Sequence, residues 1–235
     1  MQKNHWINLA QCPEIMYGQY LVPNFMSASV ALRVAENEYV LISPGADLLS
    51  DWPAALRGVQ MKISIIMPNG FHYLGVSAWL KEFPQAVLYA SARAISRLQH
   101  KGLGEIHALE QQQPALPAGY EILLVPGHRA GDVWLHKFSP GQAGVWITCD
   151  SFLNYARYSR QPLARFLQKR LDAAPGLKIS QVVKWFILDD RQAFKRWVLQ
   201  RLLTDKPGML IPSHGEIMQA GDLTEKLQAL INGRL

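Results

Sequence analysis

The chain has 235 residues, of which 24 are Lys or Arg and 18 are Asp or Glu, so its formal net charge is +6. With 49% hydrophobic and 18% charged residues, the composition excludes disorder and provides for a sizeable core. The apolar runs are too short for a membrane span, and the N-terminal segment lacks the pattern of a signal peptide. We therefore expect one cytoplasmic domain, 1–235, of mixed α and β structure, with no membrane partner.

The first half of the sequence alternates between strand-like and helix-like patterns. Strand-like segments on either side of Glu36-Asn37 predict a β-hairpin over 29–34 and 38–43. The apolar run from Ile63 to Met67 is typical of a strand buried on both faces. The elements expected after the hairpin are a short helix at 51–57, a strand at 63–67, a helix at 74–83, a strand at 86–89 and a helix at 92–100. This alternation indicates a layered α/β protein.

The second half begins after a loop at 110–119 that is rich in Gln and Pro. The elements expected there are strands at 120–125, 132–138 and 144–148, helices at 152–172 and 180–204, a strand at 209–212 and a helix at 223–231. The helix predicted over 152–172 contains the densest group of basic residues, interleaved with aromatic ones. Helical spacing gathers its apolar residues on one stripe, so we interpret the basic residues as a solvated helix face, and the sequence gives no support for a nucleic-acid partner.

The two cysteines, Cys12 and Cys149, predict reduced, buried thiols, because the chain shows no export signal. Two cysteines cannot build a zinc-thiolate cluster. Any metal must therefore be held by histidine and carboxylate side chains.

Three histidines and one aspartate directly follow strand-like segments. His72, His128 and His214 lie in loops marked by Gly or Pro, and Asp150 follows the strand at 144–148. In a layered α/β protein, residues at strand ends meet at one edge of a sheet, so these four side chains can converge. Imidazoles and a carboxylate bind zinc, iron or manganese and leave a position open for a water, which the metal turns into a nucleophile.

The chain resembles the metallo-β-lactamase-fold superfamily over nearly its full length. The resemblance rests on the early hairpin, on Pro126-Gly127-His128 followed by Gly131, on the strand that ends at Asp150, and on His214-Gly215 after a late strand. It implies a four-layer αβ/βα sandwich with the metal at the strand ends. It also implies that His128 belongs to a first metal site, that Asp150 bridges two metals and that His214 belongs to the second site.

The family's His-x-His-x-Asp-His motif is degenerate here. His72 matches its final histidine, but Met67, Asn69 and Phe71 occupy the positions of the other three ligands, which is typical of a divergent branch. The resemblance then leaves His72, Asp150 and His214 for one metal and removes the family's acid-base aspartate. No replacement is evident, and we interpret Asp132 as a surface residue.

The resemblance implies a mononuclear metal-dependent hydrolase that acts through a metal-bound water on a small ester-, thioester- or lactone-like substrate. We expect Asp150 and His128 to be catalytic, and zinc to be the metal, with iron or manganese as alternatives. Two other readings stay open. The first is a degenerate protein without catalysis or metal, with a binding or scaffolding role, and the second is a nucleic-acid-processing relative. The substrate's identity and the oligomeric state are left open.

Overall fold

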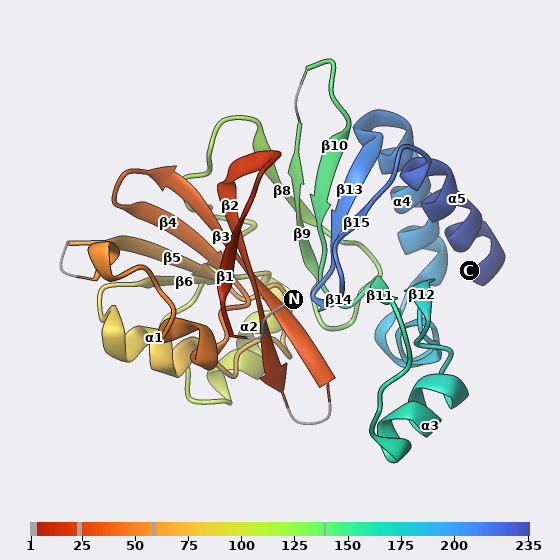
Figure 1. The fold of residues 1–235 in the computed structure, drawn as a ribbon, viewed down its shortest axis with the longest axis horizontal. Coiled ribbons are helices and arrows are strands. Elements are labelled where there is room, and N and C mark those ends of the chain that lie inside the picture. Colours follow the sequence, from red (N-terminus) through yellow and green to blue (C-terminus); the bar gives the residue numbers. More distant parts are fainter. Residues whose placement is uncertain (1–3, 23–24, 58–59, 139) are drawn as a thin grey trace. The chain divides into compact units, whose positions relative to one another are not determined.

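The structure is a computed structural model that describes residues 4–22, 25–57, 60–138 and 140–235. The chain divides into two compact units, Met1–Ala118 and Gly119–Leu235. Each unit contains a β-sheet with helices packed on it (Figure 1). The expectation that the whole chain is one domain stays a prediction. Among the described residues, no helix is both long enough and apolar enough to cross a membrane.

The first unit contains a seven-stranded sheet whose strands are neighbours in chain order. The strands are β1 (Trp6–Leu9), β2 (Cys12–Val22), β3 (Phe25–Ala35), β4 (Glu38–Ile42), β5 (Lys62–Ile66), β6 (Val87–Ala90) and β7 (His107–Ala108). The pairs from β1 to β4 are antiparallel, and those from β4 to β7 are parallel. The predicted hairpin is confirmed as β3 and β4, whereas β1 and β2 were not predicted.

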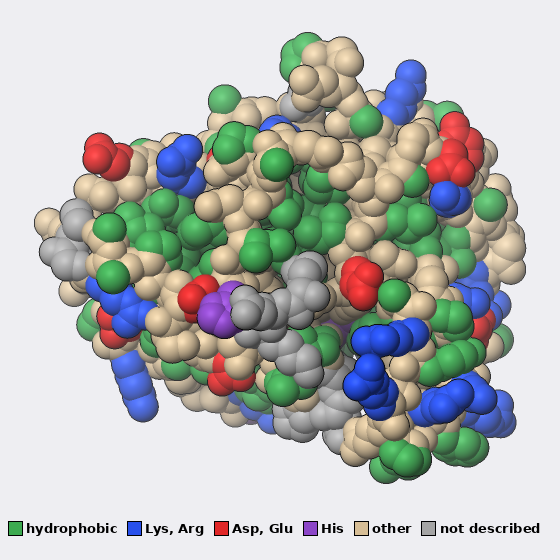
Figure 2. Space-filling view, in the orientation of Figure 1, with side chains coloured by type: hydrophobic (Ala, Val, Ile, Leu, Met, Phe, Trp, Pro, Cys, Tyr) green, Lys and Arg blue, Asp and Glu red, His purple; other side chains and the backbone are tan. Residues whose placement is uncertain are grey.

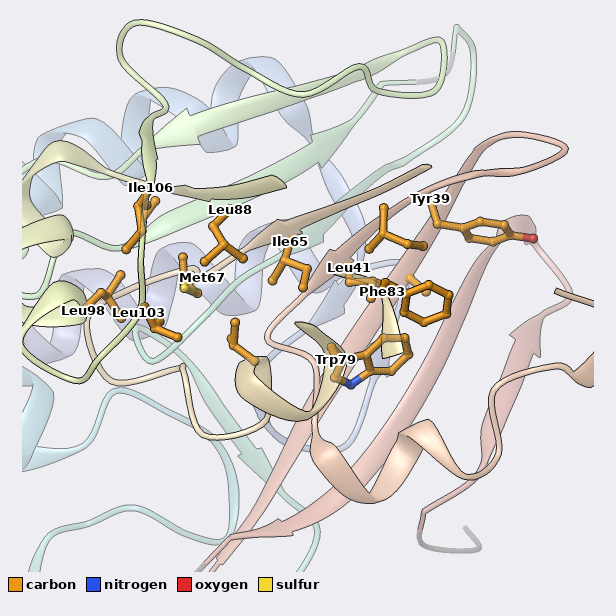
Figure 3. Close-up of a cluster of buried hydrophobic side chains, with 14 of the residues drawn as sticks. Tyr39, Leu41, Ile65, Met67, Trp79, Phe83, Leu88, Leu98, Leu103 and Ile106 are labelled. Atoms are coloured by element: carbon orange, nitrogen blue, oxygen red, sulfur yellow. The ribbon is translucent and has the colours of Figure 1, made fainter. Parts of the chain in front are cut away.

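Helices α1 (Val76–Glu82) and α2 (Ala92–Gln99) cover this sheet and agree with the predicted helices. The short helix expected at 51–57 is instead a single 3₁₀ turn, η2 (Ala54–Leu56), and another 3₁₀ turn, η1 (Ala46–Leu49), precedes it. The core lies between the sheet and the helices, where Ile65 and Leu88 of the strands meet Trp79 and Leu98 of the helices (Figure 3). The buried strand predicted from Ile63 to Met67 is confirmed as β5.

The second unit contains a five-stranded sheet with the order β15-β13-β10-β9-β8 and a three-stranded sheet with the order β12-β11-β14. The strands are β8 (Tyr120–Leu124), β9 (Val133–Lys137), β10 (Gly144–Ile147), β11 (Leu153–Tyr155), β12 (Gly176–Lys178), β13 (Pro207–Ile211), β14 (His214–Gly215) and β15 (Met218–Gln219). Only β10 and β13 are parallel neighbours in the larger sheet. Helices α4 (Arg191–Asp205) and α5 (Leu223–Arg234) pack on that sheet (Figure 1). Their buried side chains include Phe194, Val198 and Leu227.

The helix predicted over 152–172 is wrong in its first half. Strand β11 begins at Leu153, and helix α3 (Pro162–Arg170) starts only at Pro162. A proline fits the first turn of a helix and disfavours helical conformation in the residue before it, so Pro162 sets this start. The second predicted helix, 180–204, is split into the π-helix η3 (Val183–Ile187) and α4, which Asp190 caps by accepting a 2.9 Å hydrogen bond from the Ala193 N–H.

Candidate functional site

Asp150 and His214 meet at the carboxyl ends of two neighbouring parallel strands. In β10 and β13, Ile147 lies opposite Ile211, and each of the two site residues follows this pair three positions later. The Thr148 N–H donates a 2.9 Å hydrogen bond to the Ile211 carbonyl, which continues the register into the loops. Consequently His214 Nε2 lies 3.0 Å from Asp150 Oδ1, and both side chains are largely buried.

A second strand pairing holds the loop that carries His214. In β11 and β14, Leu153 lies opposite His214, and Asn154 lies opposite Gly215. Gly215 has a φ of +106°, and a Cβ atom there would lie 2.0 Å from the Asn154 carbonyl oxygen. Only glycine fits such a position. This close backbone approach therefore fixes the chain beside His214.

The surroundings of Asp150 are both apolar and negatively charged. Burial, and after it the Asp150 carboxylate, raises the pKa of Tyr155 to about 12. Burial, followed by the charges of Asp150 and Asp132, raises the pKa of the Cys149 thiol well above its usual value. Both groups therefore stay neutral at physiological pH. A largely buried site whose titratable neighbours are carboxylates and neutral groups favours a bound cation.

His128 lies in the loop after β8, where its backbone forms a β-bridge with Leu188. Gly127 before it has a φ of +67°, and a Cβ there would lie 2.1 Å from the Asp190 carbonyl oxygen, so the loop packs tightly on this segment. The His128 side chain is buried, and neither ring nitrogen has a hydrogen-bond partner among the described residues. Since unpartnered buried nitrogens are costly, a water or a ligand is expected beside the ring.

Asp132 connects His128 with the loop of Asp150. Its Oδ2 atom lies 3.8 Å from His128 Nε2 and accepts hydrogen bonds from the Ser151 hydroxyl (2.7 Å) and the Trp134 indole (2.9 Å). Asp132 is buried, so its interpretation as a surface residue was wrong. Among the described residues, His128 forms no group of three close ligand atoms with Asp150 and His214. The catalytic role expected for His128 stays a prediction.

His72 lies in the first unit, in the loop after β5, and its side chain is buried. Its Nδ1 atom is 2.7 Å from the Ser43 hydroxyl, which is in turn 3.1 Å from the Tyr20 hydroxyl. The His72 N–H donates to the Asn69 carbonyl over 3.3 Å. These contacts fix the orientation of the imidazole. The structure thus brings Asp150 and His214 together within the second unit and holds His72 in a defined setting within the first.

The three residues at the former ligand positions have other roles. Met67 is fully buried in the hydrophobic cluster of the first unit. The side-chain oxygen of Asn69 accepts a 2.8 Å hydrogen bond from the Phe71 N–H. The Phe71 ring is 42% exposed and is covered by the Arg97 guanidinium, 4.3 Å from its centre. A thioether in a core, a turn-forming amide and a phenyl ring do not form a first metal site.

A further group of titratable side chains lies in the second unit and was not predicted from the sequence as a cluster. One ligand atom from each of Glu121, His136 and Asp205 lies within 4.8 Å of the others. Arg201 donates a 2.9 Å hydrogen bond from Nε to Asp205, and its Nη2 donates to Glu121. Because one guanidinium already contacts both carboxylates, we interpret this group as an ion-pair network. Glu121 lies opposite His136 in the pairing of β8 with β9. The signal available in the sequence was that both residues fall in neighbouring predicted strands.

Asp150 and His214 fit a divalent metal by the chemistry of their donor atoms. A carboxylate oxygen and an imidazole nitrogen are ligands of zinc, iron and manganese. Both residues lie just beyond the paired ends of β10 and β13, and the Asp150 side chain lies beside the largely buried, neutral Tyr155. The pair supplies two of the three protein ligands that a metal with open positions requires.

Comparison with known proteins gives no match to a protein-family model and none to a curated sequence. Solved structures, by contrast, match over almost the whole chain. A diflavin flavoprotein fragment (1–254) from Nostoc sp. PCC 7120 has a TM-score of 0.63 and 11% identity over 98% of both chains. The metallo-β-lactamase FIM-1 from Pseudomonas aeruginosa, in a mono-zinc form, has a TM-score of 0.59 and 15% identity over 97% of this chain and 94% of its own.

A mutant flavo-diiron protein from Thermotoga maritima has a TM-score of 0.61 and 14% identity over 97% of this chain and 59% of its own. At such low identities, the likeness shows the fold alone. It confirms the predicted α/β class and the predicted resemblance. The chain has the metallo-β-lactamase fold that metallo-β-lactamases and flavo-diiron proteins share.

Proposed function

We propose that this chain is a hydrolase with one metal ion, held by His72, Asp150 and His214, and that its substrate is a small ester, thioester or lactone. The observation that carries the proposal is the Asp150–His214 pair, held 3.0 Å apart at the ends of two paired strands. Two histidines and a carboxylate are sufficient for a mononuclear metal with open positions. When bound, such a metal acidifies water and polarises a carbonyl group.

The residues around the pair define what the protein itself contributes. The side chains of Asp150 and His214 supply ligand atoms, and strand pairing holds the backbone beside His214. Ser43 orients the ring of His72. Asp132, held by Ser151, lies beside His128. The other roles taken by Met67 and Asn69 support one metal ion rather than two.

Metal content tests the proposal directly. Protein purified without chelator is expected to contain about one equivalent of zinc, iron or manganese by elemental analysis. His214→Ala should remove it, and His100→Ala is the matched control because His100 is an exposed residue at the end of α2. Metal-free wild-type protein that also gains no thermal stability from added zinc would contradict the proposal.

Hydrolysis is the second measurement. A panel of esters, thioesters and lactones should reveal turnover that Asp150→Asn lowers by at least about a hundredfold, since the variant removes a ligand charge. Turnover that survives this substitution would separate the activity from the proposed site.

A degenerate protein with a binding role is the second candidate function. It is favoured by Phe71, which occupies the position of the family's acid-base aspartate and packs under Arg97 instead. Metal binding without turnover across the panel would support this alternative. Turnover that Asp150→Asn abolishes excludes it.

A further inference from the structure

The excess positive charge of the chain is concentrated in one segment of the second unit. Residues 151–171 contain five basic residues and no Asp or Glu. The rest of the chain contains the other 19 basic residues and all 18 acidic ones, so its charge is nearly balanced. The basic residues of this segment are all exposed, and they are Arg157, Arg160, Arg165, Lys169 and Arg170. In Figure 2, Lys and Arg side chains gather over the part of the molecule that Figure 1 labels α3.

Apolar side chains are exposed in the same segment. Leu163, Phe166 and Leu167 of α3 are 63%, 63% and 45% exposed. Their i, i+3, i+4 spacing places them on one stripe of the helix, while Ala164 is the one buried residue of α3. The interpretation of this region as a helix with only its basic face in solvent was therefore incomplete. Its apolar stripe is in solvent as well.

The π-helix η3 adds two large aromatic side chains to this region. Trp185 and Phe186 are 54% and 66% exposed, and the Arg191 guanidinium lies 4.2 Å from the centre of the Trp185 ring. The Gln181 N–H donates a 2.8 Å hydrogen bond to the Leu171 carbonyl, so the end of α3 is joined to the segment that leads into η3. The basic and apolar side chains of 157–170 and of 185–186 are called the α3 face below.

The composition of the α3 face identifies its partner. Clustered exposed apolar side chains mark interaction sites. The five cations of a segment without Asp or Glu call for an anionic partner. A nucleic acid offers phosphates and base faces, but it has nothing to cover aliphatic side chains such as Leu163 and Leu167. A bilayer with anionic lipids offers phosphates for the cations and acyl chains for Leu, Phe and Trp side chains.

We propose that the α3 face docks on the surface of an anionic phospholipid bilayer. Such peripheral binding needs no spanning helix, so it replaces our expectation that the chain has no membrane partner. Leu163, Phe166 and Trp185 would enter the boundary between headgroups and acyl chains. Arg165 and Lys169 would contact lipid phosphates. The proposal is independent of the proposed hydrolase function.

Sedimentation with lipid vesicles tests the proposal on the full chain. The protein should sediment with vesicles of phosphatidylcholine and phosphatidylglycerol, should not sediment with phosphatidylcholine alone, and should be released as salt is raised. Arg165→Gln combined with Lys169→Gln should lower the partition constant roughly 25-fold, since each cation contributes about fivefold. Phe166→Ser should lower it as well, without changing the salt dependence.

The matched controls lie outside the α3 face. Leu203→Ser removes an exposed apolar side chain (73% exposed) from α4, and Lys81→Gln removes an exposed cation from α1. Both variants should sediment like the wild type, and circular dichroism verifies that all variants are folded. The proposal is overturned if the folded wild type does not bind anionic vesicles, or if the controls lose binding as much as the α3 variants do. Binding to single-stranded DNA is measured in parallel, and a Phe166→Ser variant that loses only DNA binding would also overturn the proposal.

Discussion

Ser43 holds the ring of His72 from a backbone conformation that few residues other than glycine adopt. Its φ is +51°, and its carbonyl accepts a 2.7 Å hydrogen bond from the Ser29 hydroxyl. The Ser43 hydroxyl lies 2.7 Å from His72 Nδ1, which leaves Nε2 as the ring atom for a metal. Partners of this kind set the tautomer and the orientation of a ligating histidine.

Removal of the Ser43 hydroxyl is expected to weaken metal binding about tenfold. Ser43→Gly is the preferred change, because glycine accepts the positive φ and any loss is then due to the missing hydroxyl. Competition with a chelator measures the affinity. Ser27→Ala is the control, since the buried Ser27 hydroxyl has no hydrogen-bond partner among the described residues. Unchanged affinity in Ser43→Gly would argue that His72 is not a ligand.

At the residue scale, the sequence predicts which residues belong to the candidate site better than it predicts their contacts. Asp150 and His214 were recognised because both follow strands that end at one sheet edge, and the structure pairs them. The contacts of Asp132 and Ser43 depend on loop conformations that no local pattern encodes. Asp132 therefore looked like a surface residue, although Ser151 and Trp134 bind it in the interior.

At the element scale, β14 has only two residues and depends on one glycine. Gly215→Ala would place a methyl group 2.0 Å from the Asn154 carbonyl oxygen, so the pairing of β14 with β11 should be disrupted. We expect a loss of about 2 kcal/mol or more in the free energy of unfolding, together with weaker metal binding, because His214 moves. Urea unfolding and metal titration measure both effects. Gly221→Ala, where a Cβ meets nothing within 4 Å, should change neither.

Arg201 stabilises the end of α4 against the sheet. Among the described residues, Arg201→Met leaves the buried Asp205 carboxylate with hydrogen bonds from the Trp146 indole and the Thr204 hydroxyl alone. We expect the free energy of unfolding to fall by about 2 kcal/mol, since a buried charge loses its counter-ion. Chemical denaturation of the variant should be compared with that of Arg196→Met, an exposed change on the same helix. Equal losses in both variants would mean that the network contributes nothing.

The missed elements have identifiable causes. β2 contains Pro13 and Gly18, which a sequence pattern treats as strand breakers. Gly18 nevertheless suits this strand, because a Cβ there would lie 2.7 Å from the end of the Leu48 side chain. The segment at 153–155 has helical periodicity with the residues that follow, but its pairing with β12 and β14 decides its conformation. Long-range pairing of this kind is invisible to local periodicity.

At the scale of the whole molecule, stability should depend on carboxylates in both units. Burial acts to raise the pKa of Asp51, but hydrogen bonds from the Trp6 N–H and His5 outweigh it and lower the pKa. The pKa of Glu121 is lowered in the same way, against burial, by His136 and Arg201.

A carboxylate whose folded pKa lies below its unfolded value stabilises the fold above that unfolded value. Its contribution is lost as pH falls through the folded pKa. The ordinary values are 3.8 for Asp51 and 4.5 for Glu121, so the free energy of unfolding should decline between roughly pH 5 and pH 3. Asp51→Asn with Glu121→Gln should flatten this decline. Asp47→Asn, an exposed change, should leave it as steep as in the wild type.

The overall fold was easier to predict from the sequence than the bounds and exposure of its individual elements. The order of hairpin, Pro126-Gly127-His128, Asp150 and His214-Gly215 predicted the metallo-β-lactamase fold, and the structural matches confirm it. The surface character of α3 could not be predicted, because a periodic stripe is the same in sequence whether or not something covers it.

The distribution of tryptophans gives the molecule built-in optical reporters. Of its seven indoles, Trp185 is the only exposed one, whereas Trp52, Trp79, Trp134 and Trp146 are buried. Acrylamide in the aqueous phase should therefore quench mainly the emission of Trp185, and transfer of this ring to an apolar medium should shift its emission to shorter wavelength. The variant Trp185→Phe lacks that signal, so the difference between wild type and variant identifies it, and events at the α3 face can be followed in time without a label.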